Sequence, residues 1–78
     1  MIDDMKLKEV ISNVLGVSLD EINDDSSPDS LDKWDSLSHL KLVMAIESEF
    51  NVKLSPEDSM DMLSVKLIRM ILEDALKD

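Results

Sequence analysis

Residues 36–50 read SLSHLKLVMAIESEF, and this stretch decides the fold class. On a helical wheel with about 100° per residue, one arc is apolar and consists of Leu42, Val43, Ile46 and Phe50. A second apolar ridge lies beside it and consists of Leu37, Leu40 and Met44. Glu47 falls between the two arcs. The pattern predicts a helix with more apolar surface than one core face needs, so the ridge either packs against the preceding loop or stays open for partners.

A second helix is expected before this stretch, over residues 5–15. Its apolar residues recur at helical spacing and are Leu7, Val10, Ile11, Val14 and Leu15. Asp3 or Asp4 can cap its start. Gly16, the only glycine of the chain, lies where a left-handed residue would end the helix.

Two further helices are expected after Phe50. Asn51 is suited to end the helix over residues 36–50. Ser55 and Pro56 combine an N-cap with a proline at the first helical position, which predicts a short helix. A last helix is expected from Ser64, with an apolar face that consists of Val65, Ile68, Ile71, Leu72, Ala75 and Leu76.

The connection over residues 16–35 has no sustained periodicity. Ser18 and Glu21 have capping-box spacing, which predicts a short turn. Four apolar residues can anchor the connection to a helical core: Val17, Leu19, Ile22 and Leu31. We therefore predict an all-α fold, a four-helix bundle of three longer helices and one short third helix, with a long first loop. At 78 residues, the chain is expected to form a single domain over residues 1–78.

Composition excludes several classes of function. Eighteen acidic residues against eight basic ones give a net charge of −10, which repels nucleic acid and anionic membrane surfaces and attracts basic partners. The chain has no cysteine, so a disulfide framework and a thiolate nucleophile are excluded. No window matches a calcium-binding loop, and we predict no metal site. No apolar run approaches the ~18 residues of a membrane span, so we expect a cytoplasmic location, and we also expect a monomer.

Ser36 is the residue whose role is least clear from local rules. If Asp35 is the N-cap, its carboxylate accepts the N–H of Ser38, and Ser36 becomes the first helical residue with its hydroxyl directed to solvent. A phosphodiester would suit this place, because free N–H groups and the helix dipole favour a negative group. Serine is also a common helix-starting residue, so simple capping stays open.

The chain resembles the acyl carrier protein family. The resemblance rests on Asp35-Ser36-Leu37 after a long acidic loop, on LVMAIESEF at residues 42–50, and on NVKLSPED at residues 51–58. It implies that Ser36 carries 4′-phosphopantetheine, attached from coenzyme A by a phosphopantetheinyl transferase, and that the arm bears acyl groups as thioesters. It also implies that acyl-loading and acyl-using biosynthetic enzymes bind the helix after Ser36. The expected partner-binding residues are Leu37, Leu40, Lys41, Met44 and Glu47.

Two lysines depart from the pattern of common fatty-acid carriers, which have a glycine at the position of Lys33 and an acid at that of Lys41. Both changes add positive charge and favour a carrier dedicated to one biosynthetic pathway. Trp34 replaces a small residue, and we expect it to cover the helix junction. The alternatives are an aminoacyl or peptidyl carrier, and an unmodified acidic helical docking module.

A hydrolase would need Asp35, Ser36 and His39 as a triad. Adjacent residues at a helix start cannot easily place the carboxylate on the far nitrogen of His39, and no oxyanion hole is apparent. We therefore predict that the protein is not an enzyme. His39 is expected to help close the core near the helix start, where it can border an entrance for cargo.

Overall fold

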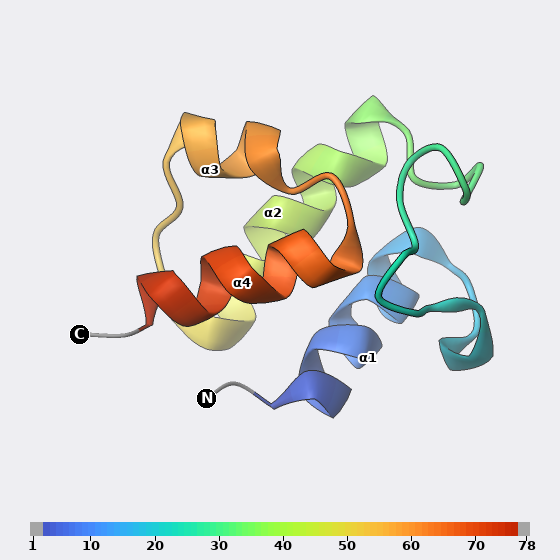
Figure 1. Ribbon diagram of the computed structural model, residues 1–78, viewed down its shortest axis with the longest axis horizontal. Helices are drawn as coiled ribbons and strands as arrows, with labels where there is room; N and C mark the ends of the chain where they lie inside the picture. Colours follow the sequence, from blue (N-terminus) through green and yellow to red (C-terminus); the bar gives the residue numbers. More distant parts are fainter. Residues whose placement is uncertain (1–2, 77–78) are drawn as a thin grey trace.

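The computed structural model describes residues 3–76, and these fold into four α-helices and one short 3₁₀ turn (Figure 1). The elements in chain order are α1 (Asp4–Leu15), η1 (Leu19–Glu21), α2 (Ser36–Phe50), α3 (Pro56–Asp61) and α4 (Val65–Ala75). No strand occurs within residues 3–76. The all-α prediction, with three longer helices, a short third helix and a long first connection, is confirmed.

Side-chain caps fix where the helices begin. The side chains that accept N–H groups of a first turn belong to Asp3, Asp35, Ser55 and Ser64, one for each α-helix. Two left-handed residues fix where helices end: Gly16 has φ +69° after α1, and Asn51 has φ +53° after α2. These ends agree with the sequence prediction, except that α1 begins one residue earlier, at Asp4.

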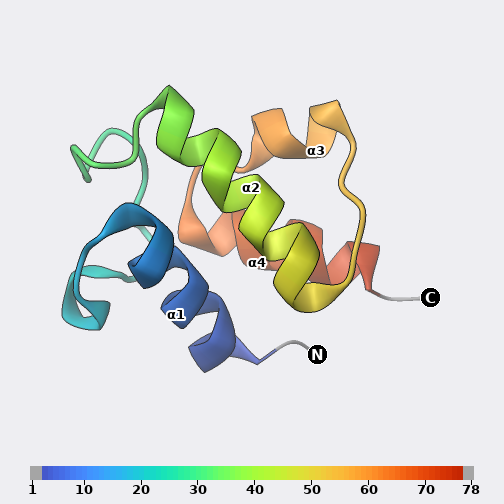
Figure 2. The same cartoon turned by 180° about the vertical axis from the view of Figure 1, so that it is seen from behind.

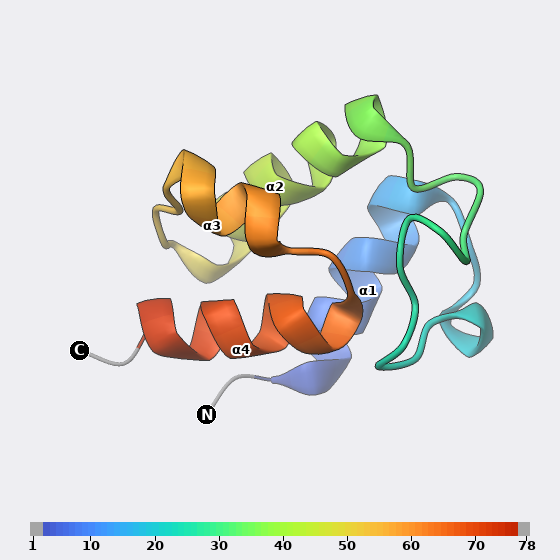
Figure 3. The same ribbon diagram turned by 45° about the horizontal axis from the view of Figure 1, so that its top comes forward.

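One core lies between the helices. Figure 2 shows α1 and α2 in front of α4, and Figures 1 and 3 both show α3 beside α4. The largest fully buried side chains are Leu7, Ile11, Trp34, Leu42, Ile46, Met62, Val65, Ile68 and Leu72. Helix α3 has no buried residue of its own, and Met62, which follows it, fills the core instead. The apolar arc predicted for residues 36–50 is therefore the inner face of α2.

Three residues expected in the core lie at the surface. Leu19 is exposed because η1 is a single turn that places this side chain beside Lys6 and Glu9 on α1. Ala75 and Leu76 continue the apolar face of α4 but are exposed as well. The periodicity identified the correct face of α4, but the buried part of that face ends at Leu72.

The long connection over residues 16–35 is fastened at both ends. Ile22 is buried, and Val17 and Leu31 are half-buried, as predicted. Glu21 accepts the N–H of Ser18 at 3.0 Å, so the predicted capping box is present at η1. The Lys33 ammonium reaches back to the carbonyl of Gly16 at 3.3 Å and so satisfies an acceptor at the end of α1.

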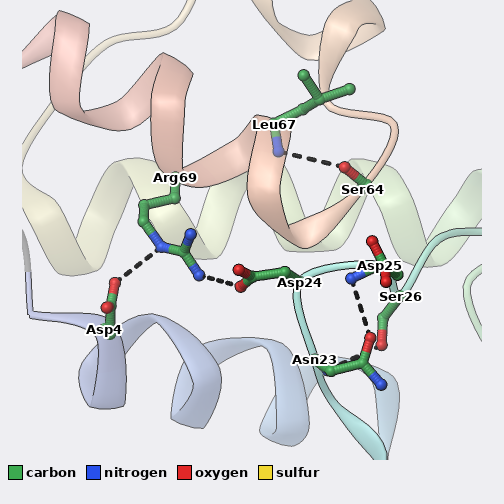
Figure 4. A network of polar contacts seen from close by, with 8 residues as sticks. All are labelled: Asp4, Asn23, Asp24, Asp25, Ser26, Ser64, Leu67 and Arg69. Carbon is green, nitrogen blue, oxygen red and sulfur yellow. Dashed lines mark hydrogen bonds and ion pairs between the residues drawn. The ribbon is translucent and has the colours of Figure 1, made fainter.

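The middle of this connection caps α4, and Figure 4 shows Asp24 of the same segment paired with Arg69. The N–H of Val65 donates to the carbonyl of Ser26 at 3.0 Å, and the N–H of Lys66 donates to that of Asp24 at 3.1 Å. Arg69 of α4 pairs with Asp24 and, at 2.9 Å, with Asp4 of α1. Two backbone N–H donors of the first α4 turn thus find acceptors 39 and 42 residues earlier. These hydrogen bonds and the Arg69 ion pairs hold the connection, α1 and α4 together.

Candidate functional site

Ser36 lies at the start of α2, exposed, as its first helical residue. The local sequence explains this placement. Asp35 has extended backbone angles, and its carboxylate accepts the N–H of Ser38 at 2.8 Å. The predicted capping geometry is confirmed, and Asp35, not Ser36, is the N-cap. The Ser36 hydroxyl is therefore not used as the cap of this helix.

The carboxylate of Asp35 is held in its ionised form. The N–H of Ser38 lowers the pKa of Asp35, with smaller contributions from the Ser38 side chain and the charge of Lys41. A carboxylate with a lowered pKa is a poor proton acceptor. Asp35 therefore positions Ser36 and is not suited to activate it.

A chain of hydrogen bonds lies behind Ser36 and joins three segments. Trp34 Nε1 donates to His39 Nδ1 at 3.0 Å, and the two rings stack with centroids 6.1 Å apart. His39 Nε2 lies 2.8 Å from the carbonyl oxygen of Ser59 in α3. Because an indole nitrogen only donates, Nδ1 must accept, and Nε2 must carry the proton that the Ser59 carbonyl accepts. The contacts therefore select one neutral tautomer of His39.

This arrangement bears on the hydrolase hypothesis. Both ring nitrogens of His39 already have partners, and neither partner is Ser36 or Asp35. His39 is thus not placed as a general base for the Ser36 hydroxyl. Trp34 is 1% exposed and covers the junction before α2, as predicted. His39 is half-buried and links α2 to α3, in agreement with its predicted place near the helix start.

An open pocket of about 560 Å³ begins at Ser36. On the α2 side, Trp34, Asp35, Ser36 and His39 line it. On the α3 side, Ser59, Met60 and Leu63 line it, and Pro28 borders it from the long connection. We call it the Ser36 pocket. Two observations fit the phosphodiester-linked arm that the sequence resemblance implies: Ser36 is exposed, and an open space lined partly by apolar side chains lies beside it.

The second apolar ridge of α2 is open. Its members Leu37, Leu40 and Met44 are 56 to 61% exposed, so the ridge does not pack against the long connection. Lys41 is also exposed and flanks the ridge. We call Leu37, Leu40 and Met44 the α2 ridge. Of the two expectations for this surface, the structure supports the open one.

Two charged residues, Glu47 and Lys33, were of interest for partner binding, and both make contacts within the fold. Glu47 is half-buried, and one of its oxygens accepts the N–H of Leu54 at 2.9 Å, which holds the segment between α2 and α3. The Lys33 ammonium contacts the end of α1, as described above, so its charge is directed toward Gly16. Within residues 3–76, the Lys41 side chain makes no hydrogen bond or ion pair, so its charge is directed to the α2 surface.

Sequence reasoning missed Ser59, Met60 and Leu63, which the fold brings to the same pocket as Ser36. They lie 23 to 27 residues after Ser36 in the chain, so no local spacing connects them with it. An available signal was the apolar character of Met60 and Leu63 around a helix too short to bury both. Met60 is in fact exposed on α3, and Leu63 is exposed just after it.

The described residues contain neither a cluster of metal ligands nor a helix that could span a membrane. Among residues 3–76, no group of three or more His, Cys, Asp or Glu side chains is placed to hold a metal ion. In the same range, none of the helices combines the length and the apolar character needed to cross a bilayer.

A family model and several known proteins match this chain, and these comparisons agree with one another. A family model described as "Phosphopantetheine attachment site" matches residues 6–68, a range that includes Ser36. The acyl carrier protein of Solidesulfovibrio magneticus is 42% identical over 62 residues, which cover 78% of each chain. That of Nitratidesulfovibrio vulgaris is 38% identical over 61 residues, which cover 78% of this chain and 80% of the relative. That of Buchnera aphidicola is 42% identical over 55 residues, which cover 69% of this chain and 68% of the relative.

Proposed function

Because this chain belongs to the acyl carrier protein family, defined by a phosphopantetheine attachment site, we propose that Ser36 is the residue to which its cofactor is attached. The protein carries acyl groups as thioesters on covalently bound 4′-phosphopantetheine. The observation that carries the assignment to Ser36 is its position: an exposed hydroxyl on the first residue of α2, beside an open pocket.

The attachment would proceed as a phosphoryl-type transfer from coenzyme A. The Ser36 oxygen bonds to the phosphorus that carries pantetheine, the pyrophosphate bond of coenzyme A breaks, and adenosine 3′,5′-bisphosphate leaves. The proton of the hydroxyl must go to a base. Asp35 is the N-cap with a lowered pKa, and His39 has both nitrogens engaged, so the transferase supplies that base.

The chain contributes positioning. The first turn of α2 directs its free N–H groups toward the place where the phosphodiester forms, which favours a negative group there. The Asp35 side chain fixes the start of this turn. We propose that the protein catalyses no reaction of its own, and that loading and transfer of acyl groups belong to its partners.

We propose that these partners bind over the α2 ridge and the residues around it. Leu37, Leu40 and Met44 supply an exposed apolar surface next to Ser36. Glu47 lies at the far end, and Lys41 adds one positive charge on the flank. A small apolar ridge with screened charges predicts weak, salt-sensitive binding, which suits a protein that must leave each enzyme after transfer.

We further propose that the carrier serves one pathway. Lys41 is exposed beside the ridge, so a partner with a wholly basic docking surface would meet repulsion there. A partner that places an acidic residue opposite Lys41 would be favoured. Aminoacyl or peptidyl cargo stays an alternative to fatty or polyketide cargo. The net charge of −10 makes association of two copies unfavourable, so we propose a monomer, with a cytoplasmic location.

The decisive experiment is intact mass spectrometry after incubation with coenzyme A, Mg²⁺ and a broad-specificity phosphopantetheinyl transferase. We expect one phosphopantetheine adduct on the wild type and none on Ser36→Ala. Ser38→Ala is the matched control, since it removes a neighbouring hydroxyl and should still accept the group. An adduct that persists in Ser36→Ala would place the site elsewhere, and no adduct with any such transferase would favour the unmodified docking module.

A further inference from the structure

We propose that an outer groove between α3 and α4 is a second docking surface, and that it binds an amphipathic helix of a partner protein with basic residues at both ends of its apolar face. The groove has a volume of about 470 Å³, and Figure 3 shows α3 and α4 side by side along it. The residues that line it are Asp61, Leu63, Leu67, Met70, Ile71 and Asp74. None of them belongs to the α2 ridge, so this surface is additional to the proposed function and independent of attachment at Ser36. Of the six, only Leu63 also borders the Ser36 pocket.

The groove exposes apolar side chains that the core leaves uncovered. Leu63, Leu67 and Met70 are 58%, 38% and 53% exposed. Ile71 is half-buried and joins them to the inner face of α4. Adjacent exposed apolar side chains with a polar rim mark interaction sites on soluble proteins. The chain thus has an apolar surface beside the α2 ridge that its carrier role leaves unused.

The spacing of this surface fits a helix. Leu67, Met70, Ile71 and Asp74 follow one another at i, i+3, i+4 and i+7, so they form one stripe along α4. At 1.5 Å per residue, the stripe is about 10 Å long, or two helical turns. Asp61 at the end of α3 and Leu63 just after it form the other wall. Such a groove matches the apolar side chains that a partner helix presents on two successive turns.

The charges of the groove are acidic at both ends. Asp61 is the last residue of α3 and lies shortly before α4, whereas Asp74 lies in the last turn of α4. Both side chains are exposed, and within residues 3–76 neither forms an ion pair. Helix α3 contains no basic residue. Charge complementarity therefore favours a segment with Lys or Arg near both ends of its apolar face.

The basic residues of α4 serve the opposite side of this helix. Arg69 pairs with Asp4 and Asp24. Besides the hydrogen bond from Arg69, the charge of Lys66 contributes to the lowered pKa of Asp24. Figure 4 shows Arg69 directed toward Asp4 of α1 and the Leu67 side chain directed away from it. The positive charges of α4 thus act on the first connection and α1, and the groove keeps its acidic character.

Two other occupants are disfavoured by the same charges. A second copy of this chain would bring the two acids of the groove against another molecule with a net charge of −10. An anionic membrane surface would repel Asp61 and Asp74 as well. A basic amphipathic helix meets neither obstacle, and its apolar side chains cover the exposed stripe.

Two synthetic peptides test the apolar face and the charges. Each is a stapled, alanine-rich helix of about 14 residues with leucine at i, i+3, i+4 and i+7, and it carries either lysine or glutamate at both ends. The full chain with Ser36→Ala is used, so the result does not depend on the attachment. Methyl-¹³C methionine gives NMR reporters: Met70 for the groove, Met44 for the α2 ridge and Met62 for the interior.

We expect the lysine peptide to shift Met70 and to leave Met44 and Met62 unchanged. The glutamate peptide should bind at least about ten-fold more weakly, because each of two exposed charge pairs changes affinity by up to about five-fold.

Matched double variants test the two acids. Asp61→Asn combined with Asp74→Asn should weaken binding of the lysine peptide at least about five-fold. Glu57→Gln combined with Glu73→Gln is the control. It also removes one acid from α3 and one from α4, but neither residue lines the groove. The control should bind the lysine peptide like the Ser36→Ala chain.

Leu67→Gln tests the apolar wall. It should weaken binding of the lysine peptide at least about five-fold, because it places an amide where the partner leucines pack. Leu76→Gln is the control, since Leu76 is similarly exposed at 42% but does not line the groove. Circular dichroism checks that both variants are folded. The double variants change exposed side chains alone, so they decide the matter even if Leu67→Gln does not fold.

Each other outcome overturns the proposal. A lysine peptide that shifts Met44 in place of Met70, or neither of them, would show that the groove is not its docking surface. Equal affinity of the two peptides would show that the two acids do not select the partner. Shifts of Met70 that depend on protein concentration without any peptide would identify a second copy as the occupant. The mass-spectrometric test of Ser36 is separate, so its failure and the failure of this proposal are distinguishable.

Discussion

His39 holds three segments together through its two ring nitrogens. Replacing it with Phe keeps a flat ring but removes the acceptor for Trp34 and the donor for Ser59. The indole N–H is then buried without a partner, which costs about 1–3 kcal/mol. We expect His39→Phe to lower the free energy of unfolding by that amount, measured by urea denaturation with the fluorescence of Trp34, the only tryptophan.

Leu37→Phe serves as the control for this variant. It adds a ring on the same helix at an exposed position and should change stability by no more than about 0.5 kcal/mol. Equal stability of His39→Phe and the wild type would mean that the two hydrogen bonds contribute nothing.

Asp24 gives a prediction about pH. Its hydrogen bond with Arg69 lowers the pKa of this carboxyl below the ordinary value of 3.8. A lowered pKa means that the folded state binds the proton less tightly than the unfolded chain. The stabilisation is therefore fully present above pH 3.8 and disappears as the pH falls through the lowered pKa.

The test compares the wild type with Asp24→Asn in urea unfolding across this range. The difference in unfolding free energy should be constant near neutral pH and shrink at pH values below 3.8. Asp25→Asn is the control, because the Asp25 carboxyl forms no ion pair within residues 3–76. If the difference in unfolding free energy between the wild type and Asp24→Asn did not change with pH, the ionised Asp24–Arg69 pair would not be the source of the stabilisation.

Residue roles could be predicted from the sequence where their partners are near in the chain. Asp35 and Ser36 followed from helix capping, which needs only the residue three positions on. The hydrogen bond that links His39 to α3 could not be predicted, because its partner Ser59 is 20 residues away and contributes only a backbone carbonyl. The same holds for Lys33, whose acceptor at Gly16 is 17 residues earlier.

Helix ends make the clearest element-scale prediction. Gly16 has φ +69° at the end of α1, and a Cβ added there would meet only the Lys33 ammonium, at 4.0 Å. Gly16→Ala therefore tests backbone conformation with little steric conflict. We expect it to lower the unfolding free energy by about 1–2 kcal/mol, the cost of a left-handed residue with a Cβ, measured by chemical denaturation.

Asn51 is the reciprocal case, since it has φ +53° at the end of α2. Asn51→Gly should leave stability unchanged or raise it slightly, because glycine adopts this conformation without strain. If both substitutions destabilised the protein equally, the left-handed conformation would not be the cause.

Three of the four helices could be predicted because each has periodic apolar residues and a capping residue of its own, and α3 could be predicted from Ser55 and Pro56 alone. Apolar periodicity does not show how far the neighbouring helices extend, and so it cannot show which apolar residues are covered. Ala75 and Leu76 satisfy the apolar pattern of α4, and Leu19 is an expected anchor of the first connection, yet all three are exposed. For the same reason, the exposure of the α2 ridge and of Leu67 and Met70 on α4 required the assembled structure.

The charge of the whole molecule leads to a prediction about salt. In the described residues, the ion pairs join Arg69 to Asp4 and Asp24, so most of the acidic residues have no close basic partner. Added salt screens the repulsion among them. We expect the melting temperature at neutral pH to rise with NaCl, by about 4–8 °C for each kcal/mol of repulsion removed.

Thermal unfolding followed by circular dichroism at increasing NaCl measures this effect. Sucrose at matched osmolality is the control, because it stabilises folded proteins without screening charge. A melting temperature that does not change with ionic strength would show that the net charge of −10 imposes no cost on the fold.

The capping of α4 by residues 24 and 26 has a consequence for synthesis on the ribosome. Asp24 and Asp4 are joined to Arg69 across 45 and 65 residues of chain, so their partner is synthesised long after them. Until residues 65–69 have left the ribosome, the first connection cannot form its contacts with α4. We therefore expect the nascent chain to complete its fold only after α4 has been synthesised. A stop codon before residue 65 would release a polypeptide without α4, so the first connection would lack the helix that it contacts in the folded protein.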